Sequence, residues 1–322
     1  MSKSGFELIN ELTRKNTPFL CLIDFKGESP MVYTLENIDP ANLKYNINGI
    51  SNVKALQETP KLTHWEKQPV DQHRYRKAFD LVQRHLHYGD TFLLNLTFPT
   101  LLKTNLDLDQ IFHLSQARYK IWVKDRFVTF SPEPFIKIEN GVISSYPMKG
   151  TIRTSEPDAA NVILNNRKES EEHLTIVDLI RNDLAMVAED ICVDRFRYLE
   201  KIRTTQSDLL QVSSKITGKV KPEFFPNLGD LLQRLLPAGS ISGAPKKKTT
   251  EIIMSAEGYE RGYFSGIVGL FDGNKFDSGV MIRFIEQTPQ GLSYKSGGGI
   301  TVNSDWKQEY QEMIDKVYVP IV

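Results

Sequence analysis

The chain has 322 residues, and its 40 basic and 40 acidic side chains give a formal net charge of zero. This length can bury a sizeable core in one large domain or two ordinary ones. The balanced charge lacks the positive excess typical of proteins that bind nucleic acid or anionic membranes, so a small-molecule partner is favoured. No stretch approaches membrane-spanning length, and the N-terminus lacks the apolar run of a signal peptide.

Cys21 and Cys192 both stand between apolar residues. We therefore expect two reduced core thiols and a cytoplasmic protein.

Periodicity predicts an α+β protein in which helices cover antiparallel sheets that form a sandwich-like core. We expect a small N-terminal portion, residues 1–70, packed on a catalytic domain of residues 71–322. Hairpin turns are predicted at Asn140-Gly141 and Asp272-Gly273. In chain order the pattern predicts a helix at 5–14, strands at 18–24 and 30–35, a polar irregular stretch at 36–74, a helix at 71–88, strands at 92–98, 120–130 and 134–147, helices at 156–188, 226–236 and 245–257, strands at 266–271 and 275–284, and a last helix at 304–317.

Lys149 stands in a tight frame, because Pro147 precedes it by two positions and Gly150 follows it directly. Proline restricts the backbone and glycine permits a close turn, so a side chain between them can be aimed. An amine is a nucleophile at neutral pH only where burial or a nearby cation lowers its pKa from about 10.4. The alternative is a solvated lysine in a surface turn.

Two predicted helices each carry a pair of carboxylates on one face. Glu169 and Glu172 share a face near the start of one helix, and Glu309 and Glu312 share a face of the last helix. Carboxylate oxygens, waters and a substrate carboxylate suit Mg²⁺. The alternative for either pair is a solvated helix face.

Residues 237–246 are a run of small residues that leads into a helix, with Pro245 expected at its first helical position. Backbone N–H groups there could hold a carboxylate, but the run does not match a Walker A loop, so a nucleoside triphosphate is not supported. The run Gly297-Gly298-Gly299 would let a ligand approach the backbone, or would form a flexible turn. Arg283, at a strand end, would clamp a carboxylate or be a surface charge.

Several short blocks occur in one characteristic order. They are Gly89-Asp90, Asn95-Leu96-Thr97, Ser131-Pro132-Glu133-Pro134-Phe135, Pro147-Met148-Lys149-Gly150-Thr151, Glu172-His173, Val177-Asp178-Leu179, Arg181-Asn182-Asp183, Ser242-Gly243-Ala244-Pro245-Lys246, Glu257, Arg261-Gly262, Ile282-Arg283, Gly297-Gly298-Gly299-Ile300 and Glu309-Tyr310-Gln311-Glu312.

Over roughly residues 70–318 the chain resembles the chorismate-utilising enzymes, and within them the first components of aminodeoxychorismate synthases. Lys149 decides between subfamilies, because anthranilate synthases carry alanine at the matching position. The resemblance implies that Lys149 attacks C2 of chorismate as the C4 hydroxyl leaves, and that ammonia then adds at C4. It also implies that Glu133 is the general acid and base, that Glu172 and Glu312 bind Mg²⁺, and that Glu169 and Glu309 act through waters.

The implied product is 4-amino-4-deoxychorismate, on the route to 4-aminobenzoate and folate. Neither cysteine has the setting of a glutaminase nucleophile, so we expect a separate glutamine amidotransferase subunit to supply ammonia, with free ammonia as the alternative. The residues that the resemblance assigns to substrate binding are Thr151, Ser242, Gly243, Arg283, Gly297, Gly298, Gly299 and Lys316.

Four positions depart from the family's common residues, so no role is transferred to them: Gln211, Phe264, Asn303 and Arg153. Two alternatives remain open at this point. One is an anthranilate synthase component, which Lys149 opposes. The other is a catalytically silent binder on the same scaffold, which the presence of Glu133, Lys149 and all four helix carboxylates opposes.

Overall fold

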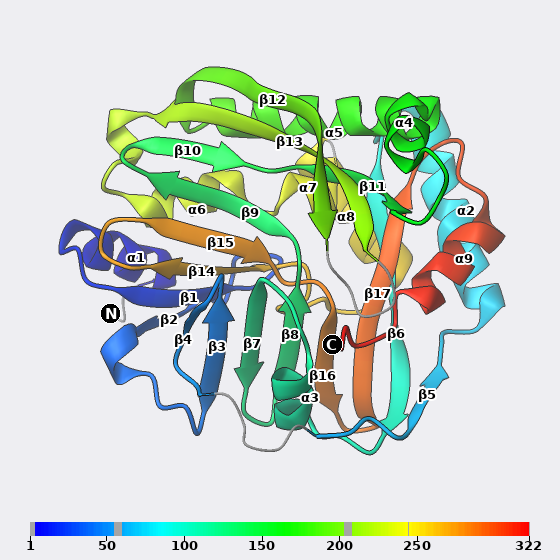
Figure 1. Ribbon diagram of the computed structural model, residues 1–322, viewed down its shortest axis with the longest axis horizontal. Coiled ribbons are helices and arrows are strands. Elements are labelled where there is room, and N and C mark those ends of the chain that lie inside the picture. Colours follow the sequence, from blue (N-terminus) through cyan, green and yellow to red (C-terminus); the bar gives the residue numbers. More distant parts are fainter. Residues whose placement is uncertain (1–3, 55–59, 203–207, 244, 322) are drawn as a thin grey trace.

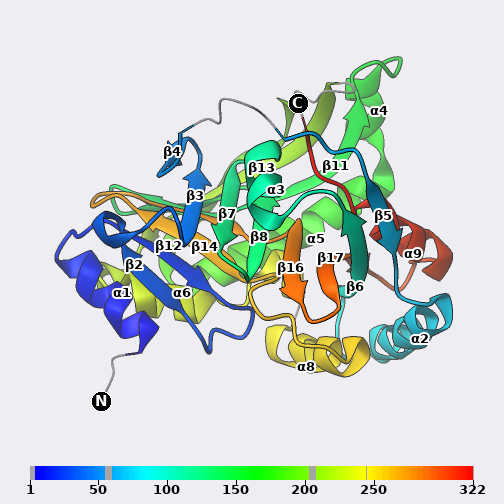
Figure 2. The same ribbon diagram turned by 90° about the horizontal axis from the view of Figure 1, so that it is seen from below.

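The computed structural model describes residues 4–54, 60–202, 208–243 and 245–321; Ala244 of the predicted small-residue run lies outside them. Two antiparallel sheets lie face to face, and helices cover their outer faces (Figures 1 and 2). The predicted α+β class with a sandwich-like core is therefore confirmed. Among the described residues, no helix is long and apolar enough to cross a membrane.

The first sheet has nine strands in the order β11-β13-β10-β9-β15-β14-β1-β2, and β12 also pairs with β13. The turn between β9 and β10 is Asn140-Gly141, where both residues have positive φ, as a tight hairpin requires. The strands are β1 (Phe19–Ile23), β2 (Met31–Thr34), β9 (Pro134–Glu139), β10 (Val142–Ser145), β11 (Met148–Arg153), β12 (Ala188–Ile202), β13 (Leu209–Val220), β14 (Ile267–Phe271) and β15 (Phe276–Val280).

The second sheet has eight strands in the order β4-β3-β7-β8-β16-β17-β6-β5. Its longest pairing joins β6 to β17, and this pairing brings Asn95 opposite Gly299 and Thr97 opposite Gly297. The strands are β3 (Leu43–Ile47), β4 (Ile50–Ser51), β5 (Trp65–Gln68), β6 (Leu94–Thr104), β7 (Tyr119–Val123), β8 (Phe127–Ser131), β16 (Phe284–Thr288) and β17 (Gly291–Ile300).

The helices begin and end at residues that satisfy their free backbone groups. Asp71 accepts hydrogen bonds from the first turn of α2, and Gly89, with φ +81°, ends that helix. Asn166 accepts from the N–H of Glu169 at the start of α5. The helices are α1 (Gly5–Arg14), α2 (Gln72–Tyr88), α3 (Leu108–Leu114), α4 (Ala159–Asn165), α5 (Arg167–Ala185), α6 (Leu228–Leu235), α7 (Gly239–Ser242), α8 (Lys246–Glu257) and α9 (Trp306–Asp315), with short 3₁₀ turns η1 (Leu35–Asn37) and η2 (Pro222–Phe224).

Strand β1 shows how the layers are packed, because both of its faces are buried. Leu20 and Leu22 lie in the core between the two sheets, with residues of β3 and β7. Phe19, Cys21 and Ile23 point the other way, into the core beneath α1, α5 and α6. Side chains alternate across a strand, so a continuous apolar run is what such a position requires.

Several predicted boundaries were wrong. The stretch 36–74 is not irregular throughout, since it contains β3, β4 and β5, and the predicted helix at 156–188 is broken into α4 and α5. Cys192 is exposed on β12 and is not a core thiol, whereas Cys21 is buried. The division at residue 70 stays a prediction, although β1 to β4 pair with strands of both sheets.

Candidate active site

A cavity of about 500 Å³ opens where β6, β11, β17, α5, α7 and α9 meet. It contains most of the residues singled out from the sequence, although they are far apart along the chain. Those that line it are Glu133, Lys149, Thr151, Glu169, Glu172, Arg283, Gly297, Gly299, Glu309, Glu312 and Lys316.

Lys149 lies on β11, at the edge of the first sheet, and not in an isolated turn. The pairing of β11 with β13 shifts register between Met148 and Thr151, and Gly150 has φ +85° there, so the strand is locally bent beside the lysine. Lys149 Nζ lies 2.7 Å from Glu172 Oε2, and its side chain is about one third exposed. The lysine therefore projects from a short, bent edge strand toward α5.

The environment of Lys149 acts on its pKa in two opposite directions. Burial alone would lower this pKa, but the hydrogen bond to Glu172 and the charges of Glu172, Glu169 and Glu312 outweigh it and raise the pKa. The resting lysine is an ammonium. Freeing its lone pair requires that these carboxylates be neutralised or drawn away.

The carboxylates of α5 and α9 approach this lysine from two sides. A Cβ on Gly150 would lie 3.1 Å from Glu169 Oε2, and one on Gly298 would lie 3.2 Å from Glu309 Oε2 and 3.5 Å from Glu312 Oε1. Glu309 accepts a hydrogen bond from Ser304, and burial raises the pKa of Glu309. Glycine at positions 150 and 298 thus leaves room for the carboxylates.

These carboxylates fit a hard divalent cation by their chemistry. Glu169 Oε2 is buried without a hydrogen-bond partner. Burying such an oxygen costs free energy unless a cation or a water molecule binds it. Glu172 and Glu312 instead form ion pairs with Lys149 and Lys316. Over the described part of the chain, no three acidic, histidine or cysteine side chains are already grouped to hold an ion. Binding Mg²⁺ would therefore require at least one of these carboxylates to turn away from its lysine.

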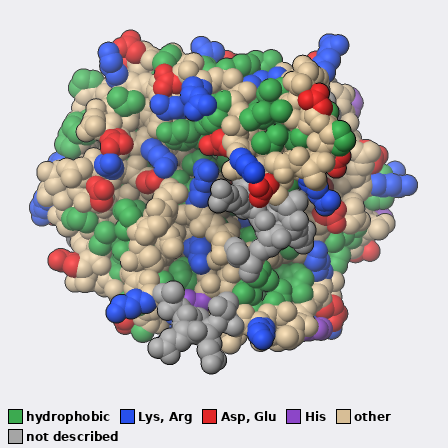
Figure 3. Space-filling view, in the orientation of Figure 1, with side chains coloured by type: hydrophobic (Ala, Val, Ile, Leu, Met, Phe, Trp, Pro, Cys, Tyr) green, Lys and Arg blue, Asp and Glu red, His purple; other side chains and the backbone are tan. Residues whose placement is uncertain are grey.

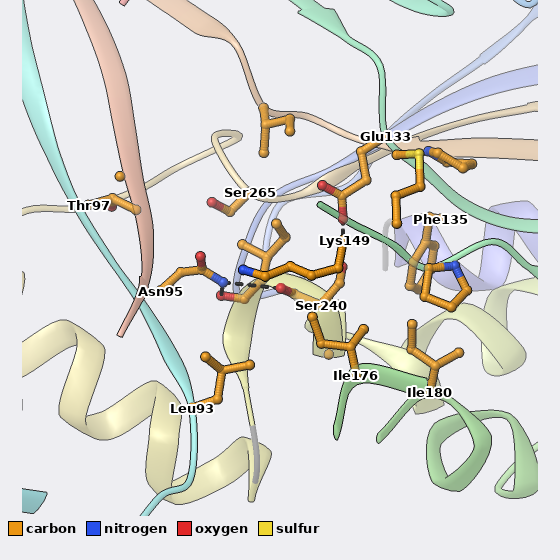
Figure 4. A pocket seen from close by; sticks show the side chains of 18 of the residues that line it. Leu93, Asn95, Thr97, Glu133, Phe135, Lys149, Ile176, Ile180, Ser240 and Ser265 are labelled. Carbon is orange, nitrogen blue, oxygen red and sulfur yellow. Dashed lines mark hydrogen bonds between the residues drawn. The ribbon is translucent and has the colours of Figure 1, made fainter. Parts of the chain in front are cut away.

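Glu133 lies between β8 and β9, and its carboxyl group reaches the same cavity (Figure 4). Burial raises its pKa, while the hydrogen bond from Ser240 and the charge of Lys316 lower it in part. A raised pKa makes a carboxyl group a better proton acceptor when ionised and lets it hold a proton at a higher pH than an exposed one. Glu133 is therefore suited to general acid and base chemistry.

Two cations flank the cavity: Arg283, directly before β16, and Lys316, directly after α9. Lys316 Nζ lies 2.6 Å from Glu312 Oε1 and donates to the carbonyl of Gly297 at 2.9 Å. Arg283 has φ +53° and donates through Nη1 to the carbonyl of Lys316, with Tyr318 stacked against its guanidinium. Both cations retain donors that could meet a carboxylate in the cavity. The glycine run belongs to strand β17 and is not a flexible turn.

Three predicted binding residues do not line the cavity: Ser242, Gly243 and Gly298. The Ser242 side chain is fully buried and donates to the carbonyl of Ala238. Gly243 has φ +92°, and a Cβ there would lie 1.8 Å from the carbonyl oxygen of Leu93. The structure places Ser242 and Gly243 in the packing of α7 against β6. Pro245 is the residue before α8 and not its first helical residue.

The polar residues of the cavity that were given no role from the sequence include Asn95, Thr97, Ser240 and Ser265. Asn95 and Thr97 had a signal, because they alternate along β6 with the buried Leu94, Leu96 and Phe98. Ser240 stands in the predicted anion loop, whose backbone N–H groups, and not the serine hydroxyl, were expected to bind.

Comparisons with known proteins agree on the family. The profile of a family described as chorismate binding enzyme matches residues 30–321. An uncharacterized PabA-like protein of Haemophilus influenzae is 48% identical over 315 residues, which are 98% of this chain and 96% of that protein. Aminodeoxychorismate synthase component 1 of Salmonella typhimurium is 31% identical over 302 residues, covering 89% of this chain but only 65% of that enzyme.

Solved structures show the same fold at low sequence identity. Anthranilate synthase component I of Streptococcus pneumoniae superposes with a TM-score of 0.75 over 98% of this chain and 85% of that chain, at 19% identity. Such a likeness establishes the architecture and leaves the reaction to the residues of the cavity.

Proposed function

This chain belongs to the family of chorismate binding enzymes, and from that premise we propose that it converts chorismate and ammonia to 4-amino-4-deoxychorismate and water. One observation carries the proposal. Lys149, a residue that could act as a nucleophile, shares one cavity with Glu133 and the four helix carboxylates, and its Nζ is 2.7 Å from Glu172.

In the proposed reaction the ammonium of Lys149 first loses a proton to solvent water in the cavity, and the neutral amine then forms a bond to C2 of the ring. The ring double bond shifts, and the C4 hydroxyl leaves as water with a proton from Glu133. Ammonia then bonds to C4, the double bond shifts back, and the lysine amine departs from C2. Glu133 takes back the proton that the new amine releases, so each step has a proton donor or acceptor in place.

Other residues of the cavity would hold the substrate. Arg283 and Lys316 offer donors for its carboxylates, Thr151 offers a hydroxyl beside Lys149, and the glycines of β17 permit close approach. Glu172 and Glu312 would hold Mg²⁺ directly, with Glu169 and Glu309 acting through waters. The ion would supply positive charge that neutralises a ring carboxylate.

A separate glutamine amidotransferase subunit is proposed as the ammonia source. Cys21 is buried inside β1, and Cys192 on β12 contacts Thr217 and Asp194. Neither arrangement has the cysteine and histidine pair that a glutaminase needs.

The test is mass spectrometry of products and of intact protein after incubation with chorismate, Mg²⁺ and ammonium at pH 8.5. Wild type, Lys149→Ala and Lys215→Ala are compared. Lys215 is the matched control, because on neighbouring β13 it forms an ion pair with Asp194 outside the cavity. We expect a 4-amino product from wild type and Lys215→Ala, and about a hundredfold or greater loss in Lys149→Ala.

An anthranilate product from wild type, or an unchanged rate in Lys149→Ala, would overturn the proposal. The metal assignment is tested by titrating Mg²⁺ in the presence of chorismate. Glu172→Gln and Glu312→Gln should each raise the Mg²⁺ concentration needed for half-maximal activity. Rates independent of Mg²⁺ in the wild type would remove this site.

A further inference from the structure

We propose that Asn95 and Ser240 are positioning residues for Glu133: the amide of Asn95 holds α7 in place, and the hydroxyl of Ser240 on α7 holds one carboxylate oxygen of Glu133. The other oxygen is then directed to the substrate. This inference rests on the general acid and base role proposed for Glu133.

The contact between Ser240 and Glu133 is direct. Ser240 Oγ donates to Glu133 Oε1 at 2.8 Å, and both residues line the cavity, where Figure 4 shows Ser240 between Asn95 and Glu133. A hydroxyl that donates to one oxygen of a carboxyl group restricts rotation of the group and favours its ionised form. Glu133 Oε2 remains as the oxygen that can exchange a proton with the substrate.

Asn95 controls where this hydroxyl lies. Its Nδ2 donates to the carbonyl of Ser240 at 3.1 Å and to that of Ile241 at 2.9 Å. A helix of four residues has few internal hydrogen bonds, so these two external bonds are a large share of what fixes α7. The side chain of one strand residue thus sets the position of the serine.

Two close approaches leave α7 little freedom to take another position. A Cβ on Gly239 would lie 2.4 Å from Asp183 Oδ2 of α5, and one on Gly243 would lie 1.8 Å from the carbonyl oxygen of Leu93. The short helix is therefore fitted between α5 and β6. Its place depends on β6 being held firmly.

Strand β6 is anchored from behind by a buried ion pair. Arg261 Nη2 donates to the carbonyl of Asn95 at 2.7 Å, and Glu257 Oε1 accepts from the backbone N–H of Thr97 at 2.8 Å. Arg261 and Glu257 are 3% and 1% exposed. A continuous series of contacts therefore runs from this pair through Asn95 and Ser240 to Glu133.

The first experiment measures ionisation of Glu133 in the free protein. Glutamate labelled with ¹³C at the carboxyl carbon is titrated by NMR, and the signal is assigned with Glu133→Gln. Loss of the Ser240 hydroxyl removes a donor to the ionised form, so Ser240→Ala should move the midpoint to higher pH, by about one pH unit. Ser240→Thr keeps a hydroxyl and should titrate like wild type.

Ser242→Ala is the matched control. It removes a hydroxyl from the same helix, one that is fully buried and donates to the carbonyl of Ala238 and not to Glu133, so the titration of Glu133 should not move. Asn95→Leu, of similar shape but without a donor, should shift the midpoint in the same direction as Ser240→Ala. The double variant should shift no further than Ser240→Ala alone, because Asn95 acts through the serine.

Kinetics with chorismate, Mg²⁺ and ammonium give the second readout. Ser240→Ala should lower kcat about tenfold with KM for chorismate nearly unchanged, and the acid limb of the kcat profile should move to higher pH. Circular dichroism and urea unfolding identify any variant that fails to fold. If Asn95→Leu fails, Asn95→Ala replaces it.

The outcomes separate this inference from the proposed function. An unmoved Glu133 titration in Ser240→Ala, or additive shifts in the double variant, overturns the inference even where wild type makes the 4-amino product. If wild type makes no such product but the NMR shifts occur as expected, the positioning contact stands and the proposed reaction fails.

Discussion

The buried pair of Arg261 and Glu257 allows a quantitative test of how β6 is held. Arg261 donates to Glu257 through Nε at 2.9 Å and also through Nη2, and the two side chains are 2% and 1% exposed. Arg261→Met keeps most of the aliphatic stem and removes the charge. It leaves the Glu257 carboxylate buried without its cation.

Breaking a buried ion pair by removing one partner costs about 3–5 kcal/mol. We expect the lower end, about 3 kcal/mol, because Glu257 Oε1 still accepts from the N–H and the hydroxyl of Thr97. Adding Glu257→Gln should recover about half of that loss, since a neutral amide oxygen can keep both bonds to Thr97 without a buried charge.

The assay is equilibrium unfolding in urea, followed by tryptophan fluorescence and circular dichroism at pH 7.5. Arg181→Met is the matched control, because Arg181 forms an exposed pair with Asp178 in α5 and should cost less than about 0.5 kcal/mol. A loss below about 1 kcal/mol in Arg261→Met, or no recovery in the double variant, would refute the reasoning.

Two further predictions concern packing and ionisation. Gly243→Ala should lower the unfolding free energy by more than about 3 kcal/mol in the same assay, because its Cβ meets the Leu93 carbonyl and φ is +92°, whereas Gly258→Ala, at φ +63° in open space, should cost about 1 kcal/mol. Burial lowers the pKa of Lys120 to about 8, from 10.5 in its ordinary environment. Between these pH values the unfolded chain binds more protons, so wild type should gain stability relative to Lys120→Met from pH 7 to pH 10. An equal difference between the two proteins at both pH values would contradict this cause.

The parts of the fold predicted correctly were those with local signals. The Asn140-Gly141 turn, the helix predicted at 71–88 and the strand predicted at 18–24 each follow from residues close in sequence. The predictions were wrong where secondary structure depends on pairing between strands that are far apart in the sequence. Polar residues of the stretch 36–74 form strands because the second sheet supplies partners, as β7 does for β3.

In the candidate site, too, local spacing was predictable and contacts between residues far apart in the sequence were not. Spacing alone placed Glu169 beside Glu172 and Glu309 beside Glu312, but it did not reveal that one pair faces Lys149 through the room left by Gly150. The contact of Ser240 with Glu133 joins residues 107 positions apart, and no periodicity encodes such a contact. The raised pKa of Lys149 likewise depends on the charge of three carboxylates from two helices.

Acidic and basic side chains are interspersed over the face drawn in Figure 3, as the neutral composition predicts. This mixing gives the face that Figure 3 draws no single sign of charge to attract a polyanion.

The position of Lys149 on an edge strand has an evolutionary consequence. Strand β11 pairs with β13 on one side, and the lysine side chain projects into a solvent-accessible cavity and not into a close-packed core. Replacement at this position leaves the layers of the sandwich intact, so selection can exchange the side chain at position 149 without first compensating a loss of stability. Under the proposed reaction, a single codon change at residue 149 would therefore change the chemistry of an ancestral scaffold, while Glu133 and the four helix carboxylates were inherited unchanged.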